Sequence, residues 1–304
     1  MVSVYDLHKQ YGRVNALRGL TFSVGEGEIY GIIGPDGAGK TSLFRILATL
    51  LLPDGGRATV DGLDAVRDYR ELRRRIGYMP GRFSLYQDLS VEENLRFFAS
   101  VFGTTIERNC GLIRDVYSRL EPFKTRRAGK LSGGMKQKLA LCCALIHAPR
   151  VLLLDEPTTG VDPVSRREFW QMLKRISRDN GITVLVSTPY MDEASWCDRI
   201  SLMQCGRLLQ TGTSAEICES YSANLFAMRS DDMHRLLLDL KACHIATSAF
   251  SFGDSIHVTL DDVIAPSALS EYLQQRGHTG VEVKRIRPSV EDCFISITGQ
   301  YVKQ

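Results

Sequence analysis

The segment from Gly34 to Thr41 reads GPDGAGKT, and it constrains the fold of this 304-residue chain more than any other. It satisfies the pattern G-x-x-x-x-G-K-[ST], follows the apolar run 29–33 and precedes a helix-like stretch, 42–52. A strand, a glycine-rich loop and a helix in this order point backbone N–H groups and a helix N-terminus at phosphates. A glycine-rich turn that matches by chance is the alternative, and the motifs below make it negligible.

The residues of this loop have different predicted tasks. Lys40 is expected to reach the β- and γ-phosphates of ATP, the Thr41 hydroxyl to ligate Mg²⁺, and Ser42 to contact a phosphate. Asp36 is expected to act mainly as a turn residue. The residues predicted to bind the nucleotide here are Gly34, Asp36, Gly37, Ala38, Gly39, Lys40, Thr41 and Ser42.

A second segment, VLLLDEP from Val151 to Pro157, is an apolar run that ends in two carboxylates. A buried parallel strand delivers such groups to the C-terminal edge of a sheet, where ligands bind. Asp155 is expected to hold Mg²⁺ directly or from just outside its coordination sphere, and Glu156 to polarise the water that attacks the γ-phosphate. Glu156 and Lys40 are therefore the predicted catalytic residues. Two acidic residues that merely cap a helix are the alternative.

A third segment, LSGGMKQ from Leu131 to Gln137, is another glycine-rich loop at the start of a predicted helix. With it the chain resembles the ABC transporter ATPases. The resemblance implies that Ser132, Gly133 and Gly134 close over the γ-phosphate held by a second module, so that one chain makes two half-sites.

Two further segments extend the resemblance. Tyr11, in QYGRVNAL, falls where the family stacks an aromatic ring on adenine, although a plain surface aromatic is the alternative. The residues 161–163 match the loop that signals between the two sites of a dimer.

Two positions depart from the family pattern. After IGYMP the family carries a glutamine that senses Mg²⁺ and the attacking water, and this chain has Gly81. After TVLVST it carries a histidine that contacts the γ-phosphate, and this chain has Pro189, which offers no donor. Gln87 is taken as an ordinary loop residue. Losing one such contact costs about 2.7–4 kcal/mol of transition-state stabilisation, so we expect a site that holds ATP but hydrolyses it slowly.

The intact LSGGMKQ segment suggests an asymmetric partner. This chain can complete a competent pocket on a second ABC ATPase module that has its own glutamine and histidine. A heterodimer then gives one good site and a homodimer gives two poor ones, so a heterodimer is favoured.

The length fits about two domains. We expect an α/β nucleotide-binding domain of the ABC ATPase type over 1–217, with a mixed core sheet and a helical subdomain over about 85–148. Over 222–304 the pattern runs strand, helix, strand, strand, helix, strand, which predicts an α+β ferredoxin-like accessory domain. The tail 288–299 resembles the closing helix of drug- and lipid-export ATPases, in which such domains often aid dimerisation. A stabilising appendage is the alternative.

The remaining features concern partners and location. No run of 18 apolar residues and no leader is present, so we expect a cytoplasmic protein, held at the inner face of the cell membrane by membrane-spanning permease subunits. Phe83, Leu85 and Tyr86 are candidates for docking these subunits, and packing inside the helical subdomain is the alternative. The net charge of +3 and short basic runs do not indicate nucleic acid. The sequence thus predicts the ATP-binding subunit of an ABC exporter. A soluble ATP switch or a structural ATP-binding module is the alternative.

Overall fold

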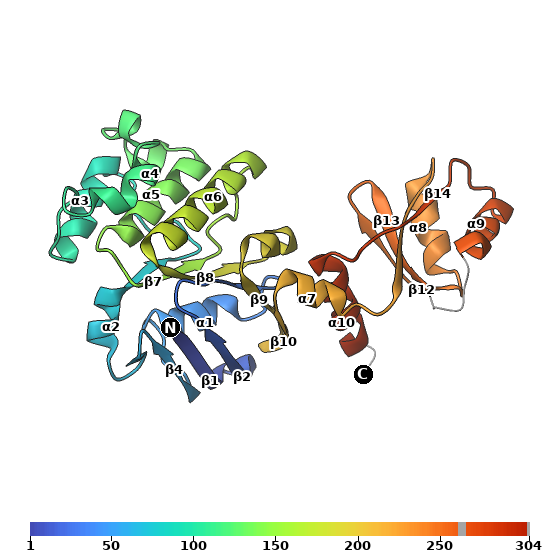
Figure 1. Cartoon of the computed structure of the whole chain (residues 1–304), viewed down its shortest axis with the longest axis horizontal. Helices are drawn as coiled ribbons and strands as arrows, with labels where there is room; N and C mark the ends of the chain where they lie inside the picture. Colours follow the sequence, from blue (N-terminus) through green and yellow to red (C-terminus); the bar gives the residue numbers. More distant parts are fainter. Residues whose placement is uncertain (261–265, 303–304) are drawn as a thin grey trace. The chain divides into compact units, whose positions relative to one another are not determined.

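The structure is a computed structural model that describes residues 1–260 and 266–302. The chain divides into two compact units, Met1–Ser214 and Ala215–Gln304, coloured blue to yellow and orange to red in Figure 1. None of the helices in the described ranges combines the length and hydropathy that a membrane span requires.

A six-stranded sheet forms the centre of the first unit. Its order is β10-β9-β3-β8-β7-β6, and all neighbouring pairs are parallel except β10 with β9. The sheet is therefore mixed, as predicted. The side chains of β3, β7 and β8 are all buried, which explains their nearly continuous apolar sequences. The strands are β3 (Ile29–Ile33), β6 (Ile76–Met79), β7 (Val151–Asp155), β8 (Thr183–Thr188), β9 (Arg199–Gln204) and β10 (Arg207–Gly212).

A second, antiparallel sheet has the order β2-β1-β4-β5. One hydrophobic cluster joins this sheet to the central one through helix α1, with side chains such as Leu20, Phe44 and Leu153. The elements are β1 (Val2–Tyr11), β2 (Val14–Val24), α1 (Lys40–Leu47), β4 (Gly55–Val60), β5 (Leu63–Asp64) and α2 (Tyr69–Arg75).

Helix α1 ends earlier than the sequence predicted. The apolar pattern continues to residue 52, but the helix ends at Leu47 because Thr49 adopts a left-handed φ of 60°. The following amides of Leu50 and Leu51 then bond back to the carbonyl of Arg45, which closes the helix end.

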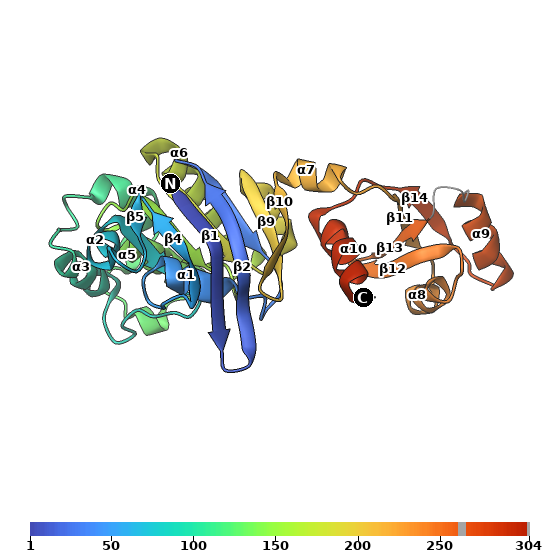
Figure 2. The same ribbon diagram turned by 90° about the horizontal axis from the view of Figure 1, so that it is seen from below.

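The helices predicted between β6 and β7 are present. Figures 1 and 2 show α3, α4 and α5 grouped on one side of the first unit, away from β1 and β2. Ser90 and Glu93 form a reciprocal cap at the start of α3. The buried Asn94 bonds to both the amide and the carbonyl of Tyr86, which fixes the loop before α3. The helices between β6 and β7 are α3 (Val91–Val101), α4 (Cys110–Tyr117), η1 (Glu121–Phe123), η2 (Ala128–Lys130) and α5 (Gly133–Leu145). Helix α6 (Pro163–Asn180) follows β7, and η3 (Met191–Trp196) follows β8.

The second unit has the predicted order of strands and helices. Its sheet has the order β12-β13-β11-β14 with every pair antiparallel, which is the ferredoxin-like arrangement. Helices α8 and α9 supply core residues such as Leu236 and Leu269. The elements are α7 (Ser214–Glu219), β11 (Asn224–Arg229), α8 (Met233–Lys241), β12 (Ala246–Phe252), β13 (Ser255–Leu260), α9 (Pro266–Gln275), β14 (Glu282–Arg285) and α10 (Val290–Val302).

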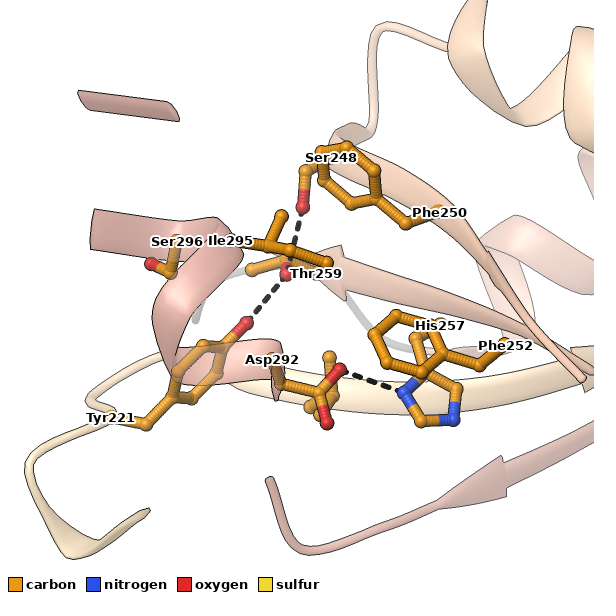
Figure 3. Close-up of a pocket in the computed structure, with 10 residues that line it drawn as sticks. Tyr221, Ser248, Phe250, Phe252, His257, Thr259, Asp292, Ile295 and Ser296 are labelled. Carbon is orange, nitrogen blue, oxygen red and sulfur yellow. Dashed lines mark hydrogen bonds and ion pairs between the residues drawn. The ribbon is translucent and has the colours of Figure 1, made fainter. Parts of the chain in front are cut away.

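Helix α10 is attached to the sheet of the second unit through polar side chains (Figure 3). Asp292 accepts a hydrogen bond from Nδ1 of His257 at 2.7 Å, and the His257 ring stacks on Phe252. Beside this pair, Tyr221 and Ser248 both bond to the hydroxyl of Thr259, at 2.7 and 3.0 Å. Helix α10 is thus a fixed part of this unit.

Candidate functional site

The glycine-rich loop lies between β3 and α1, and two of its glycines are required by close backbone contacts. A Cβ at Gly34 would lie 2.0 Å from the carbonyl oxygen of Met203. Gly39 has a φ of 108°, and a Cβ there would lie 2.3 Å from the carbonyl oxygen of Ala16. The loop therefore keeps a conformation that other residues cannot adopt, with its N–H groups ahead of the N-terminus of α1.

Lys40 is buried inside this loop, with only 3% of its surface exposed. Its Nζ donates to the carbonyl oxygens of Gly34 at 2.7 Å and Pro35 at 3.0 Å. It also lies 3.1 Å from Oε1 of Glu156, so the two predicted catalytic residues are in contact. A phosphate group would compete with Glu156 for this ammonium group.

Thr41 and Asp155 form the second part of the site. The Thr41 hydroxyl lies 3.3 Å from Oδ1 of Asp155, and the Ser187 hydroxyl donates to the same oxygen at 2.7 Å. Burial raises the pKa of the Asp155 carboxyl, and the bonds from Ser187 and Thr41 oppose that rise. A hydroxyl and a carboxylate are the oxygen donors that Mg²⁺ prefers, so this pair fits the predicted ion.

Glu156 has an unusual backbone. Its φ is +51°, a left-handed conformation that costs a non-glycine residue on the order of 1–2 kcal/mol. Its amide donates to both the carbonyl and the hydroxyl oxygen of Ser187, each at 3.0 Å. The neighbouring strand β8 therefore holds this residue in a strained position, as is typical of functional sites.

Gly81 and Pro189, the two positions expected to depart from the family pattern, lie beside this group. A Cβ at Gly81 would lie 3.1 Å from the carbonyl oxygen of Asp155 and 3.7 Å from Cβ of Glu156. Pro189 follows Thr188, whose carbonyl oxygen accepts a hydrogen bond from the amide of Gly34. A side chain at either position would thus start close to the phosphate loop or to Glu156. Gln87 instead accepts a backbone bond from Gly129 in the helical region.

The LSGGMKQ segment leads into α5, with Ser132 and Gly133 exposed and Leu131 buried. Ser132 caps this helix by accepting a bond from the amide of Met135 at 3.4 Å. A Cβ at Gly134 would lie 2.9 Å from the hydroxyl oxygen of Ser165 in the first turn of α6, so Ser165 would have to move to admit another residue. Among the described residues, no hydrogen bond or ion pair joins Ser132 to Lys40 or Glu156.

Tyr11 lies at the end of β1, next to the first turn of α1. Its hydroxyl is 3.4 Å from that of Ser42, and 45% of the residue is exposed. The ring is thus available to a planar ligand above the phosphate loop, and the Lys9 ammonium lies 5.6 Å from its centroid.

An apolar groove of about 350 Å³ lies between the central sheet and the helical region. Its lining includes Leu50, Leu85, Val101 and His147. Leu85 is buried, as the packing alternative predicts, whereas Tyr86 is half exposed and lies edge-on to Phe97. The docking prediction therefore has a different outcome for each of these two neighbouring residues. Leu85 is a wall of the groove, and Tyr86 is a surface residue.

Three residues that the sequence did not single out complete the surroundings of the site: Ser187, Thr188 and Glu193. Ser187 bonds to both acidic residues at the end of β7, as described above. Glu193 is buried and accepts bonds from the hydroxyls of Thr158 and Thr188. The only signal in the sequence was a pair of hydroxyl residues at the end of the otherwise apolar strand TVLVST.

Comparisons with known proteins show which proteins this chain resembles. A sequence model of a family described as ABC transporter matches residues 17–159. The probable multidrug ABC transporter ATP-binding proteins YbhF of Escherichia coli (strain K12) and Shigella flexneri are both 38% identical over 98% of this chain. The alignment covers 52% of each, so the chain spans about half the length of these curated relatives.

Other relatives match over nearly their whole length. The daunorubicin resistance ATP-binding protein DrrA3 of Streptomyces coeruleorubidus is 35% identical over 98% of this chain and 96% of its own. The Nod factor export ATP-binding protein I of Rhizobium sp. (strain N33) is 31% identical over 100% and 98%.

Two solved structures resemble the first unit. CbiO1 from Clostridium perfringens, described as part of the ABC transporter complex cbiONQ, has a TM-score of 0.64 and 28% identity, covering 72% of this chain and 90% of its own. The dimeric structure of MJ0796, a bacterial ABC transporter cassette, has a TM-score of 0.64 and 27% identity, covering 70% and 98%.

Proposed function

This chain belongs to the family of ABC transporter ATP-binding proteins, and we propose that it is the cytoplasmic ATP-binding subunit of an exporter. In this proposal it binds MgATP, hydrolyses it and thereby powers transport through separate membrane subunits at the inner face of the cell membrane. The observation that supports it best is the contact of Lys40 with Glu156 beside the Thr41–Asp155 pair. Relatives named for drug resistance and Nod factor export support the direction of transport.

The proposed nucleotide site uses the loop from Gly34 to Ser42. Its N–H groups and Lys40 bind the phosphates, and Tyr11 stacks on adenine. Thr41 and Asp155 hold Mg²⁺, which supplies charge neutralisation on the phosphates. Glu156 takes the role of the group that orients and polarises the attacking water.

Hydrolysis at this site is proposed to be slow. Glu156 is bonded to Lys40 and strained at its backbone, yet Gly81 and Pro189 supply no donor to hold it or the water in register. Binding depends on Lys40 and on the loop amides, which these two positions leave intact. The proposed site thus binds ATP normally and hydrolyses it slowly.

The LSGGMKQ segment is proposed to complete a pocket on a second ABC ATPase module, in a heterodimer rather than a homodimer. Ser132 and Gly133 are exposed at the N-terminus of α5, where the free N–H groups of a helix can bind a γ-phosphate. The dimeric form of the similar cassette MJ0796 supports pairing of such units.

This pairing has a direct test. Adding a candidate second module to the chain is expected to raise the ATPase rate at least about tenfold, because one complete site then forms. Ser132→Arg should remove that gain, since its side chain obstructs the phosphate, while Ser118→Arg on the exposed end of α4 should keep it. The measurement is phosphate release from the mixed, purified proteins. Equal rates with Ser132→Arg and wild type would refute the proposed role of the segment.

The apolar groove is proposed to receive a short helix of the membrane subunit, because apolar helices bind in such grooves. Val101 lies at its rim and is exposed. Val101→Asp is expected to reduce recovery of the chain with membranes that contain its permease at least about tenfold, through the cost of burying an unpaired charge. MgATP affinity should not change. Leu238→Asp, an exposed apolar position on α8, is the control. Normal recovery of Val101→Asp would exclude this groove.

A further inference from the structure

Glu193 is a buried carboxylate to which the proposed mechanism assigns no role. It lies in η3, two per cent exposed, and accepts hydrogen bonds from the hydroxyls of Thr158 at 2.8 Å and Thr188 at 2.6 Å. Both threonines are fully buried, with 1% and 0% exposed. Hydrogen bonds are electrostatically stronger in a buried environment than in water, and these two join one carboxyl group to two separate segments.

The two segments are those that shape the candidate site. Thr158 lies in the loop that carries Glu156, directly after β7. Thr188 is the last residue of β8, and its carbonyl oxygen bonds to the amide of Gly34 at the start of the phosphate loop. The Thr188 hydroxyl also accepts a bond from the amide of Tyr190, which fixes the turn through Pro189. Glu193 therefore links the Glu156 loop to the strand end that supports the phosphate loop.

This link supports Glu156 in its strained backbone conformation. Glu156 is held in a left-handed backbone conformation that relaxes unless its surroundings oppose it. Gly81 and Pro189 provide no side-chain donor to oppose it from the ligand side. Ser187 fixes the amide of Glu156, and the Thr158–Glu193–Thr188 network fixes the chain just after it.

We propose that Glu193 is a positioning residue of the ATPase site, which acts through Thr158 and Thr188 to hold Glu156 in register with the phosphate loop. This proposal rests on the proposed function of Glu156. Glu193 itself contacts neither the nucleotide nor the attacking water. A small displacement of a reacting group costs rate rather than affinity, so turnover and binding should separate.

The first variant is Thr158→Val, which keeps the shape of the side chain and removes one hydrogen bond to Glu193. We expect the single-turnover rate of ATP hydrolysis to fall about tenfold to a hundredfold, with MgATP affinity within about twofold of wild type. Glu193→Gln can still bond to both threonines, because a hydroxyl donates to its amide oxygen and accepts from its amide nitrogen. It should therefore retain most of the rate that Glu193→Ala loses.

The matched control is Ser177 in helix α6, next to the residue that precedes β8. Its buried hydroxyl lies within hydrogen-bond distance of the carbonyl oxygens of Ile182, at 2.9 Å, and Gly27, at 3.2 Å. Ser177→Ala thus removes a buried hydroxyl near the start of β8, at the opposite end of that strand from the site. We expect it to lower the melting temperature about as much as Thr158→Val does and to leave turnover unchanged.

The experiment uses the full chain in excess over labelled MgATP, and a second assay compares binding of MgADP with aluminium fluoride against MgADP alone. The inference holds if Thr158→Val lowers the rate, or the preference for the fluoride complex, while Ser177→Ala does not. It is overturned if Thr158→Val matches wild type in both assays, or if Ser177→Ala is equally impaired. A wild-type rate below detection would contradict hydrolysis by the isolated chain, and the fluoride assay alone then decides the role of Glu193.

Discussion

Lys40→Met is expected to weaken MgATP binding about 10- to 100-fold, because hydrogen bonds to charged groups contribute about 1.5–3 kcal/mol and each 1.4 kcal/mol is tenfold. Methionine fills nearly the same buried volume without a charge or donor. The carbonyl oxygens of Gly34 and Pro35 accept hydrogen bonds from Nζ, so the charge that methionine removes lies inside the loop. The rate of ATP hydrolysis by Lys40→Met should also fall below detection.

The measurement is isothermal titration calorimetry of the full chain with MgATP and MgADP. Lys138→Met is the matched control, because Lys138 is also mostly buried and paired with a glutamate, Glu168, at 2.8 Å, but lies on α5. It should bind MgATP as wild type does. Unchanged affinity in Lys40→Met would mean that the nucleotide binds elsewhere on the chain.

The contact of Lys40 with Glu156 adds a second consequence. Because the two side chains are 3.1 Å apart, phosphate binding must draw the ammonium away from the carboxylate or share it. Glu156→Gln should therefore bind MgATP at least as tightly as wild type while it loses turnover. Tight binding without hydrolysis in this variant separates the two tasks that the sequence assigned to these residues.

The contact between the phosphate loop and the two carboxylates after β7 could be predicted from the sequence, because the topology of a parallel sheet requires it. A phosphate loop after one parallel strand and two carboxylates after another must meet at the same edge of the sheet. The structure shows that β8 lies between β3 and β7. The last residues of β8 therefore face both loops, and Ser187 bonds to both acidic residues. Strand order is not written in any local pattern, so this role of Ser187 could not be predicted.

The environments of Glu193 and Leu85 could not be predicted from the local sequence either. An acidic residue after a strand usually lies on a solvated turn, and only the tertiary fold reveals that Glu193 is buried against two hydroxyls. Leu85 stands beside an exposed tyrosine in the sequence, but it packs into the wall of the groove.

In the second unit the alternation of strand and helix patterns was strong enough to predict the ferredoxin-like order. The polar attachment of α10 through Asp292 was not predictable, because its partner His257 lies far away in the sequence.

Pro189→His is expected to raise the single-turnover rate of ATP hydrolysis by about 100- to 1,000-fold, because one added donor to developing charge is worth two to three decades in well-studied sites. The backbone supports this change, since Thr188 already bonds to Gly34 and a histidine can adopt the φ to which proline is restricted. The imidazole would then start beside the phosphate loop. Gly81→Gln is a weaker candidate, because its Cβ must fit 3.1 Å from the carbonyl of Asp155.

The comparison that decides this is single turnover of wild type, Pro189→His and Pro189→Ala under identical conditions. Pro189→Ala removes the proline without adding a donor, so it should stay near the wild-type rate, and adding Glu156→Gln to Pro189→His should abolish the gain. A gain confined to histidine means that the missing donor at position 189 limits hydrolysis at this site, which favours a partner module that carries most of the hydrolysis. A fast wild-type rate that depends on Glu156 and does not respond to Pro189→His would mean that another group already makes this contact, and a homodimer would then be sufficient.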